Sequence, residues 1–307
     1  MSAVGAQLNQ SNFKGETMRY WMSLITLAFV TTSAAQDLTP DRTLRKNRNT
    51  YHPVMDVLKS QRTAVTDQQL EDLRRFPLEA IWGVLKGLGY DKYMTGLKGT
   101  RPEARLVGRA LTIRYLPRRP DLEAAMTTLA GEGDWPVSYN VRAAEEAKAG
   151  DVLVVDLGGE TTNGVFFGDI SALGAQTAGA RGAILYGSTR DLAELREMMD
   201  FPVFSMGFDP NVAVEIGVDW NVPIRAGGAT VLPGDVVVAE EEAALFFPPQ
   251  LAADVVTKAR QLVEQEIYER NLVRQRKYRF RDVYPLNPEL HRQFEAERKA
   301  KEQDSKR

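Results

Sequence analysis

The chain has 307 residues, 43% of them hydrophobic and 26% charged, and its formal net charge is −2. These values are typical of a soluble globular protein and exclude a disordered, collagen-like or multi-span membrane chain. The absence of cysteine excludes disulfides, thiolate nucleophiles, zinc–cysteine sites and iron–sulfur clusters, and the charge balance gives no reason to expect nucleic-acid binding.

A short apolar run near the N-terminus resembles an export signal. Residues 21–30 read WMSLITLAFV, Arg19 precedes them, and Ser33 and Ala35 follow at the spacing of a signal-peptidase site. The run is short for a membrane-spanning helix, which needs about 20 residues. We predict that residues 1–35 are an upstream extension and signal peptide, that the mature protein is periplasmic or secreted, and that it has no membrane contact after cleavage. The alternatives are a buried helix or a membrane anchor, and a cytoplasmic location is expected if the run is not a signal.

The polar segment that follows is expected to be an N-terminal arm over residues 36–66. It contains His52, one of the chain's two histidines, in an extended pre-proline context. The other, His291, lies in a charged C-terminal stretch. Two histidines exclude a three-histidine metal site within one chain, and neither context favours a catalytic role.

Three elements are predicted before the central part of the chain. Residues 67–88 are expected to form one helix, because Thr66 and Gln69 can form a capping box and apolar residues follow at helical spacing. Residues 106–115 (LVGRALTIRY) alternate as a strand does. Residues 143–149 favour a short helix that ends at a glycine.

The central block alternates between strands and helices. Apolar strands are predicted at 152–155, 182–186 and 202–206, with helices at 170–180 and 192–199 between them. The connections are short, so we expect parallel strands joined by right-handed crossovers.

The last third of the chain differs in pattern. Residues 222–249 contain short apolar runs separated by Gly227-Gly228 and by Pro-Gly-Asp, which predicts β-hairpins or a small barrel. Residues 250–274 favour a long amphipathic helix. The remaining residues, 276–307, are expected to be a charged tail with one apolar anchor at residues 281–285.

Three charged residues follow consecutive strands of the predicted parallel sheet. Asp169 opens the helix after the first strand, and Arg190 and Asp191 follow the second, with 20 residues between Asp169 and Arg190. Ligands bind at the carboxyl ends of such strands, so these side chains should converge there. The amides of Asp169, Ile170 and Ser171 would be free to bind an anion at the start of the helix.

Two interpretations of this trio remain open from the residues alone. Asp169 and Asp191 can be helix N-caps, with Arg190 paired to one of them. Alternatively, Arg190 binds a substrate carboxylate while the two acids hold a divalent cation. Oxygen ligands favour Mg²⁺ or Mn²⁺.

The motifs also resemble a known family over residues 75–275. The Asp-x20-Arg-Asp pattern of Asp169, Arg190 and Asp191 is similar to the signature of the family of the regulator of ribonuclease E activity A (RraA). The segment PIRAGGATVLPGDVVVAEEEAALFFPP resembles the closing β segment of that family. Its enzymatic branch comprises the 4-hydroxy-4-methyl-2-oxoglutarate aldolases, which are class II pyruvate aldolases.

The resemblance implies a role for each residue. Asp191 would hold Mg²⁺ largely through water, and Arg190 would contact the 2-oxo oxygen and stabilise the enolate. Asp169 would orient a metal-bound water, and the amides after Gly168 would bind the carboxylate of the substrate. In the family, a glutamate from a neighbouring subunit's C-terminal helix can reach the site; Glu266 is the candidate here, although it can equally be a solvated helix-face glutamate.

The implied reaction is retro-aldol cleavage of a small 4-hydroxy-2-oxo acid to pyruvate, with oxaloacetate decarboxylase side activity because both reactions pass through the same enolate. Two alternatives stay open. One is a non-catalytic regulatory or binding protein on the same scaffold, a branch in which the acid corresponding to Asp191 is commonly lost. The other is a different enolate reaction, such as sugar-acid dehydration.

The resemblance also implies the fold and the assembly. We expect an α/β fold of the swivelling β/β/α type, with residues 67–275 as the catalytic domain, an N-terminal arm and a long C-terminal helix. A homotrimer or hexamer with sites between subunits is expected. The chain departs from the family pattern at Ser188-Thr189, where a small apolar pair is more common, and at Glu240–Ala243, which leaves the substrate open.

Overall fold

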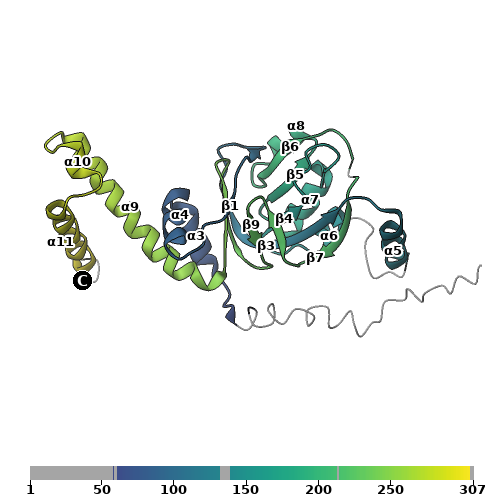
Figure 1. Cartoon of the computed structure of the whole chain (residues 1–307), viewed down its shortest axis with the longest axis horizontal. Helices are drawn as coiled ribbons and strands as arrows, with labels where there is room; N and C mark the ends of the chain where they lie inside the picture. The colour runs from purple at the N-terminus through teal and green to yellow at the C-terminus, as the bar shows by residue number, and fades with distance from the viewer. Residues whose placement is uncertain (1–57, 59–60, 132–138, 213, 305–307) are drawn as a thin grey trace, which may run out of the picture. The chain divides into compact units, whose positions relative to one another are not determined.

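A curled β-sheet with helices against its faces organises the part of the chain that the computed structural model describes, residues 58, 61–131, 139–212 and 214–304 (Figure 1). The predicted signal peptide, most of the predicted arm and His52 lie outside these residues. Among the described helices, none is long and apolar enough to cross a membrane.

Four parallel strands form the centre of the sheet. They are β3 (Leu106–Leu116), β4 (Asp151–Asp156), β5 (Ala183–Thr189) and β6 (Val203–Phe208), paired in that order. The parallel pairing of the three strands predicted in the central block is confirmed. Val152, Leu153, Val154 and Val155 are fully buried, as expected for a strand covered on both faces.

Antiparallel strands extend and curl this sheet. Among the described residues, the strand order is β1-β11-β10-β3-β4-β5-β6-β2, with β7 paired to β3 off this path. The strands involved are β1 (Tyr93–Met94), β2 (Lys98–Gly99), β7 (Ile216–Trp220), β10 (Val236–Ala239) and β11 (Ala244–Phe247). A separate hairpin pairs β8 (Ile224–Ala226) with β9 (Ala229–Val231) around Gly227-Gly228, so the predicted hairpins are confirmed.

One face of the parallel strands is covered by α6 (Tyr139–Glu146), α7 (Asp169–Ala178) and α8 (Leu192–Glu197). The helix predicted at 143–149 lies earlier in the chain, because the residues before β4 form a turn instead. In that turn the Lys148 amide donates to the Asp151 carboxylate at 2.9 Å, and Gly150 has a φ of +86°. A further helix, α5 (Pro120–Gly131), precedes α6.

The single helix predicted over residues 67–88 is wrong: the structure has α3 (Asp67–Arg75) and α4 (Leu78–Gly87). Pro77 separates them, because proline lacks an amide hydrogen and favours an extended conformation for Phe76 before it, which has φ −90° and ψ 141°. The predicted capping box of Thr66 and Gln69 at the start of α3 is confirmed.

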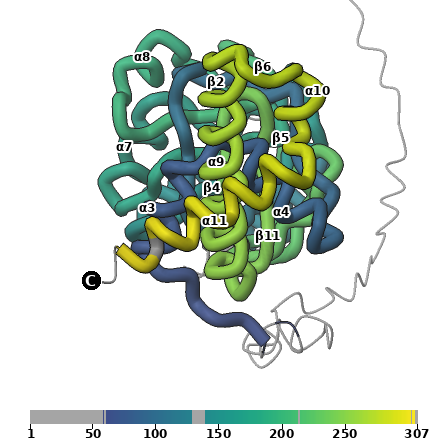
Figure 2. Tube along the Cα trace, turned by 90° about the vertical axis from the view of Figure 1, so that its left-hand side faces the viewer, coloured from purple at the N-terminus to yellow at the C-terminus, as the bar shows by residue number. Residues whose placement is uncertain are grey.

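The C-terminal region consists mainly of helices in its described part. After a short 3-10 turn at Pro249–Leu251, α9 (Ala252–Gln275) packs against α3 and α4 and confirms the predicted long helix. It is followed by α10 (Phe280–Val283) and α11 (Pro288–Asp304), and α11 returns alongside α9 (Figures 1 and 2). Leu290 and Phe294 of α11 are buried, and the Phe294 ring lies 5.5 Å from that of Tyr268 on α9. The residues expected to be a charged tail therefore form two helices that pack back onto α9 through a small apolar cluster of Leu272, Val283 and Leu290.

Candidate active site

The predicted trio converges where β5 ends and α7 begins. The Asp169 amide donates to Oδ2 of Asp191 at 3.3 Å, and the Arg190 Nε lies 3.4 Å from the same oxygen. The Arg190 and Asp191 side chains are 36% and 35% exposed, so both remain open to a ligand. Chain segments separated by 20 residues are therefore brought together as the sequence predicted.

Gly168 makes this close approach possible. A Cβ atom at this position would lie 1.8 Å from Asp191 Oδ2 and 2.9 Å from Arg190 Nε. The backbone at Gly168 is extended, with φ −115° and ψ −163°, so no special conformation requires glycine. The absence of a side chain is what allows the Asp191 carboxylate to reach α7.

Asp191 occupies the N-cap position of α8 but does not cap that helix with its side chain. Its φ of 55° lies in the left-handed region, which is uncommon for a residue other than glycine. The carboxylate instead points across to the first turn of α7. The N-cap of α7 is Gly168, so Asp169 is the first helical residue rather than a cap. The N-cap interpretation therefore does not account for either carboxylate, although the pairing of Arg190 with Asp191 is present.

Two buried hydroxyl side chains on β5 hold the loop that leads into α7. The Thr189 hydroxyl donates to the Phe167 carbonyl at 2.9 Å, and the Ser188 hydroxyl donates to the Gly164 carbonyl at 3.2 Å. Both residues are fully buried. Ser188 and Thr189, the pair that departs from the family pattern, thus fix the loop against β5 immediately before Arg190. The burial of Ser188 and Thr189 was not predicted, because the strand was expected to end at residue 186.

The first turn of α7 presents free amides. The first helical bond runs from the Ala172 amide to the Gly168 carbonyl, at 3.1 Å, so the amides of Ile170 and Ser171 precede it. The Ser171 hydroxyl accepts from the Asn140 side chain of α6 at 3.0 Å. The prediction of a free amide at Asp169 is wrong, because that amide donates to the Asp191 carboxylate. The amides of Ile170 and Ser171 lie next to Arg190, with Ser171 held in place by α6.

The donor set fits a magnesium ion that is bound mainly through water. No group of three or more His, Cys, Asp or Glu side chains that could enclose a metal occurs in the described part of the chain. Mg²⁺, however, is commonly held by one or two carboxylates together with waters and substrate oxygens. Asp191 supplies a half-exposed carboxylate of this kind. The Asp169 carboxylate accepts no hydrogen bond from a described residue and is free for a second contact.

The other candidate residues lie elsewhere in the described chain. Glu266 is on α9, where it pairs with Arg270 of the same helix at 2.7 Å, and Figure 1 places α9 away from α7 and α8. Glu266 thus does not join the trio within one copy of the chain. His291 is exposed on α11 and stacks loosely near Phe294, at 6.4 Å.

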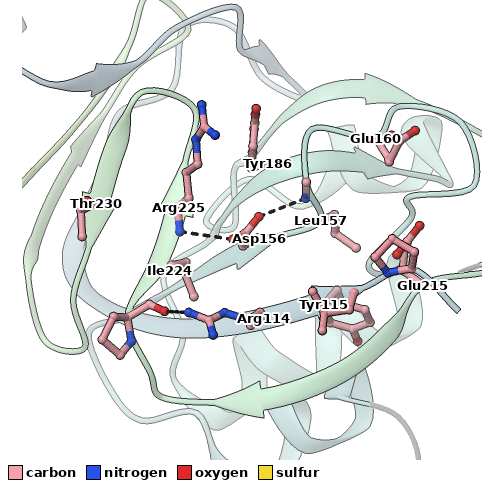
Figure 3. Close-up of a pocket in the computed structure, with 14 residues that line it drawn as sticks. Arg114, Tyr115, Asp156, Leu157, Glu160, Tyr186, Glu215, Ile224, Arg225 and Thr230 are labelled. Carbon is pink, nitrogen blue, oxygen red and sulfur yellow. Dashed lines mark hydrogen bonds between the residues drawn. The ribbon is translucent and has the colours of Figure 1, made fainter. Parts of the chain in front are cut away.

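A second group of polar residues lines a cavity on the opposite face of β4 and β5. Asp156 and Tyr186 from these strands and Arg225 from β8 contribute to it (Figure 3). These residues were not predicted from the sequence. Asp156 directly follows the strand predicted at residues 152–155, and a polar residue at a strand end is a signal that could have identified it. Arg225 reaches the cavity only because the β8–β9 hairpin folds over the sheet.

Comparisons with known proteins agree with this architecture. Residues 62–245 match the family model described as RraA-like, Aldolase/RraA. A Halalkalibacterium halodurans protein provisionally named a 4-hydroxy-4-methyl-2-oxoglutarate aldolase is 31% identical over 121 residues, 39% of this chain and 57% of that protein. The matched segment thus spans little more than half of that relative's length. A Deinococcus radiodurans protein with the same provisional name is 32% identical over 150 residues, 48% of this chain and 89% of that protein.

The fold has solved counterparts as well. The crystal structure of Streptomyces coelicolor RraAS2, an unusual member of the RNase ES inhibitor RraA protein family, superimposes with a TM-score of 0.57 at 26% identity. It covers 67% of this chain and 98% of the solved chain. The expected α/β fold with its long C-terminal helix is thereby confirmed.

Proposed function

Because the chain belongs to the RraA-like family, we propose that it is a divalent-metal-dependent carbon–carbon lyase that cleaves a 4-hydroxy-2-oxo acid to pyruvate. The observation that carries the proposal is the convergence of Arg190 and Asp191 on the N-terminus of α7, within 3.4 Å of one another. The names of the two bacterial relatives support the same reaction class.

In this proposal the start of α7 binds the substrate. The amides of Ile170 and Ser171 lie at the positive end of the helix dipole and suit the carboxylate next to the 2-oxo group. Arg190, half exposed beside them, donates to the 2-oxo oxygen.

The chemical step develops negative charge at one oxygen. When the C3–C4 bond breaks, its electron pair moves through C3 and C2 to the 2-oxo oxygen, which becomes an enolate. Arg190 would stabilise this charge, because its guanidinium lies beside the helix N-terminus that would bind the neighbouring carboxylate. Mg²⁺ held by Asp191 would supply a second positive charge there when bound. Asp169 orients a water that takes the proton of the 4-hydroxyl group and passes it to the Asp169 carboxylate, and return of this proton through the water to C3 of the enolate gives pyruvate. Loss of carbon dioxide from oxaloacetate produces the same enolate, so decarboxylase side activity follows.

We further propose that the site is completed in a trimer or hexamer. Ile170 and Leu173 on α7 are 81% and 56% exposed, although both are large apolar residues beside the trio. A neighbouring copy that covers them would exclude water from the substrate. Whether Glu266 of that copy contributes to the site can be tested by mixing Glu266→Gln and Asp191→Ala subunits. Activity recovered in the mixed oligomer would support a shared site, and no recovery would contradict it.

The decisive experiment measures pyruvate release from oxaloacetate and from 4-hydroxy-4-methyl-2-oxoglutarate. We expect release with Mg²⁺, loss of release in EDTA, and loss in Asp191→Asn, a variant that keeps the size of the side chain. Asp200→Asn serves as the matched control, because Asp200 is an exposed acid shortly after α8. Release that is insensitive to EDTA and to Asp191→Asn would refute the assignment.

A regulatory role on the same scaffold is the second candidate, favoured by the structural similarity to RraAS2. It predicts a folded protein that binds a partner and releases no pyruvate from either compound. The same assay therefore separates the two candidates.

A further inference from the structure

A cavity of about 700 Å³ lies over the carboxyl ends of β3 and β4 and is walled by the β8–β9 hairpin (Figure 3). The cavity opens on the face of the sheet opposite α7. Its lining residue Tyr186 packs with the apolar cluster that includes β8 and β9, whereas Ala172 and Ala175 of α7 pack in the cluster on the other face of the sheet. None of the residues that line it belongs to the trio of the proposed active site.

Two of its polar side chains are used to build the cavity. Asp156 accepts hydrogen bonds from the Gly158 amide at 3.0 Å and from the Arg225 amide at 3.2 Å, which ties the hairpin to the end of β4. Arg114 donates to the Pro223 carbonyl and lies 3.5 Å from the Asp219 carboxylate. These groups are already engaged, so they shape the cavity more than they select a ligand.

A positive charge without an acidic partner lies at one end of the cavity. Arg225 uses its Nε to donate to the Gly227 carbonyl at 2.8 Å, and its remaining nitrogens form no ion pair within the described ranges. In Figure 3 its guanidinium extends in the same direction as the Tyr186 hydroxyl. The Tyr186 ring is held in place because it packs over Gly159, where a Cβ atom would lie 2.9 Å from the ring.

Two negative charges lie at the other end. Glu160 and Glu215 line the same cavity, and neither forms an ion pair with a described cation. Burial raises the pKa of the Glu215 carboxyl, and the negative charge of Glu160 raises it further. Neither negative charge is therefore stabilised by a salt bridge, and a positively charged group of a ligand would provide that stabilisation.

We propose that this cavity binds a small dipolar ligand, an amino acid whose charges are well separated, with its carboxylate at Arg225 and Tyr186 and its ammonium at Glu160 and Glu215. A dicarboxylate would be repelled by the two glutamates, and a diamine would be repelled by Arg225. Charges of opposite sign at the two ends of one cavity select a ligand that carries both in the reverse order. This site lies beyond the proposed lyase function and does not depend on it.

The test is calorimetric titration of the full chain at neutral pH with three five-carbon probes: 5-aminopentanoate, glutarate and 1,5-diaminopentane. We expect 5-aminopentanoate to bind at least tenfold more tightly than either of the others. Arg225→Gln and Glu215→Gln should each weaken its binding at least tenfold, whereas Arg75→Gln and Glu242→Gln, changes at exposed residues outside the cavity, should not.

Equal binding of the three probes, no binding of 5-aminopentanoate, or binding that survives Arg225→Gln would each overturn the proposal. Arg225 is exposed, so its variant should fold, and a melting curve checks this. The Asp191→Ala variant should bind 5-aminopentanoate as the natural sequence does. That result keeps failure of this site distinct from failure of the proposed lyase activity.

Discussion

Replacing Gly168 with alanine tests the geometry of the proposed active site directly. The added Cβ would lie 1.8 Å from Asp191 Oδ2, whereas ordinary contact begins at 3.4 Å, so the carboxylate has to move by roughly 1.6 Å. The backbone at Gly168 is extended, which alanine also adopts, so the clash is the only direct cost.

The consequences for activity and for stability differ in size. A displacement of about 1 Å in a catalytic group typically lowers turnover about 100-fold, so Gly168→Ala should lower the rate of pyruvate release by at least that factor. The folding cost should be only about 1 kcal/mol, because the contacts that are lost, Asp169 amide to Asp191 and Asp191 to Arg190, involve half-exposed side chains that water can solvate.

The assay combines Mg²⁺-dependent pyruvate release with chemical denaturation. Gly87→Ala is the matched control: nothing lies within 4 Å of its Cβ position at the end of α4, so it should be neutral or slightly stabilising. Adding Asp191→Gly to Gly168→Ala removes the clashing carboxylate and leaves the milder 2.9 Å approach to Arg190 Nε, so it should relieve most of the folding penalty but not recover activity. Full activity in Gly168→Ala would refute the reasoning.

Three further changes have defined outcomes. Arg190→Ala should remove about 3–4 kcal/mol of transition-state stabilisation and lower kcat accordingly. An unchanged kcat would exclude Arg190 from the site. Asp235→Ala breaks a buried ion pair with Arg62 and should lower the free energy of unfolding by about 3–5 kcal/mol in urea; a loss below about 1 kcal/mol would mean the pair contributes little. Truncation after Tyr284 removes the buried Leu290, so hydrogen exchange should speed up in the second half of α9 while the sheet stays protected, and uniform loss of protection would contradict this.

Much of the candidate site could be predicted from the chain alone. The alternation of strands and helices in the central block and the spacing of Asp169, Arg190 and Asp191 are local properties, and parallel pairing brings consecutive strand ends to one edge. The role of Gly168 could not be predicted in this way. Its lack of a side chain has meaning only once Asp191, 23 positions later, lies against it.

The errors in helix prediction have similar causes. Apolar periodicity continues from α3 into α4, but Pro77 breaks the backbone without breaking the pattern, so the stripe suggested one helix where there are two. In the last helix, α11, charged residues dominate the composition. Leu290 and Phe294 become buried only because the chain turns back onto α9, a contact that local composition does not reveal.

The sequence by itself determined the α/β class, the parallel strands and the residues of the trio, because each depends on patterns within a few dozen neighbouring positions. Only the tertiary structure decided which carboxylate faces which helix, and that a cavity with opposite charges lies on the other face of the sheet. Arg225 and Glu160 are 65 positions apart and share no local pattern. They come to one cavity because the β8–β9 hairpin folds over the ends of β3 and β4, a long-range contact set by packing.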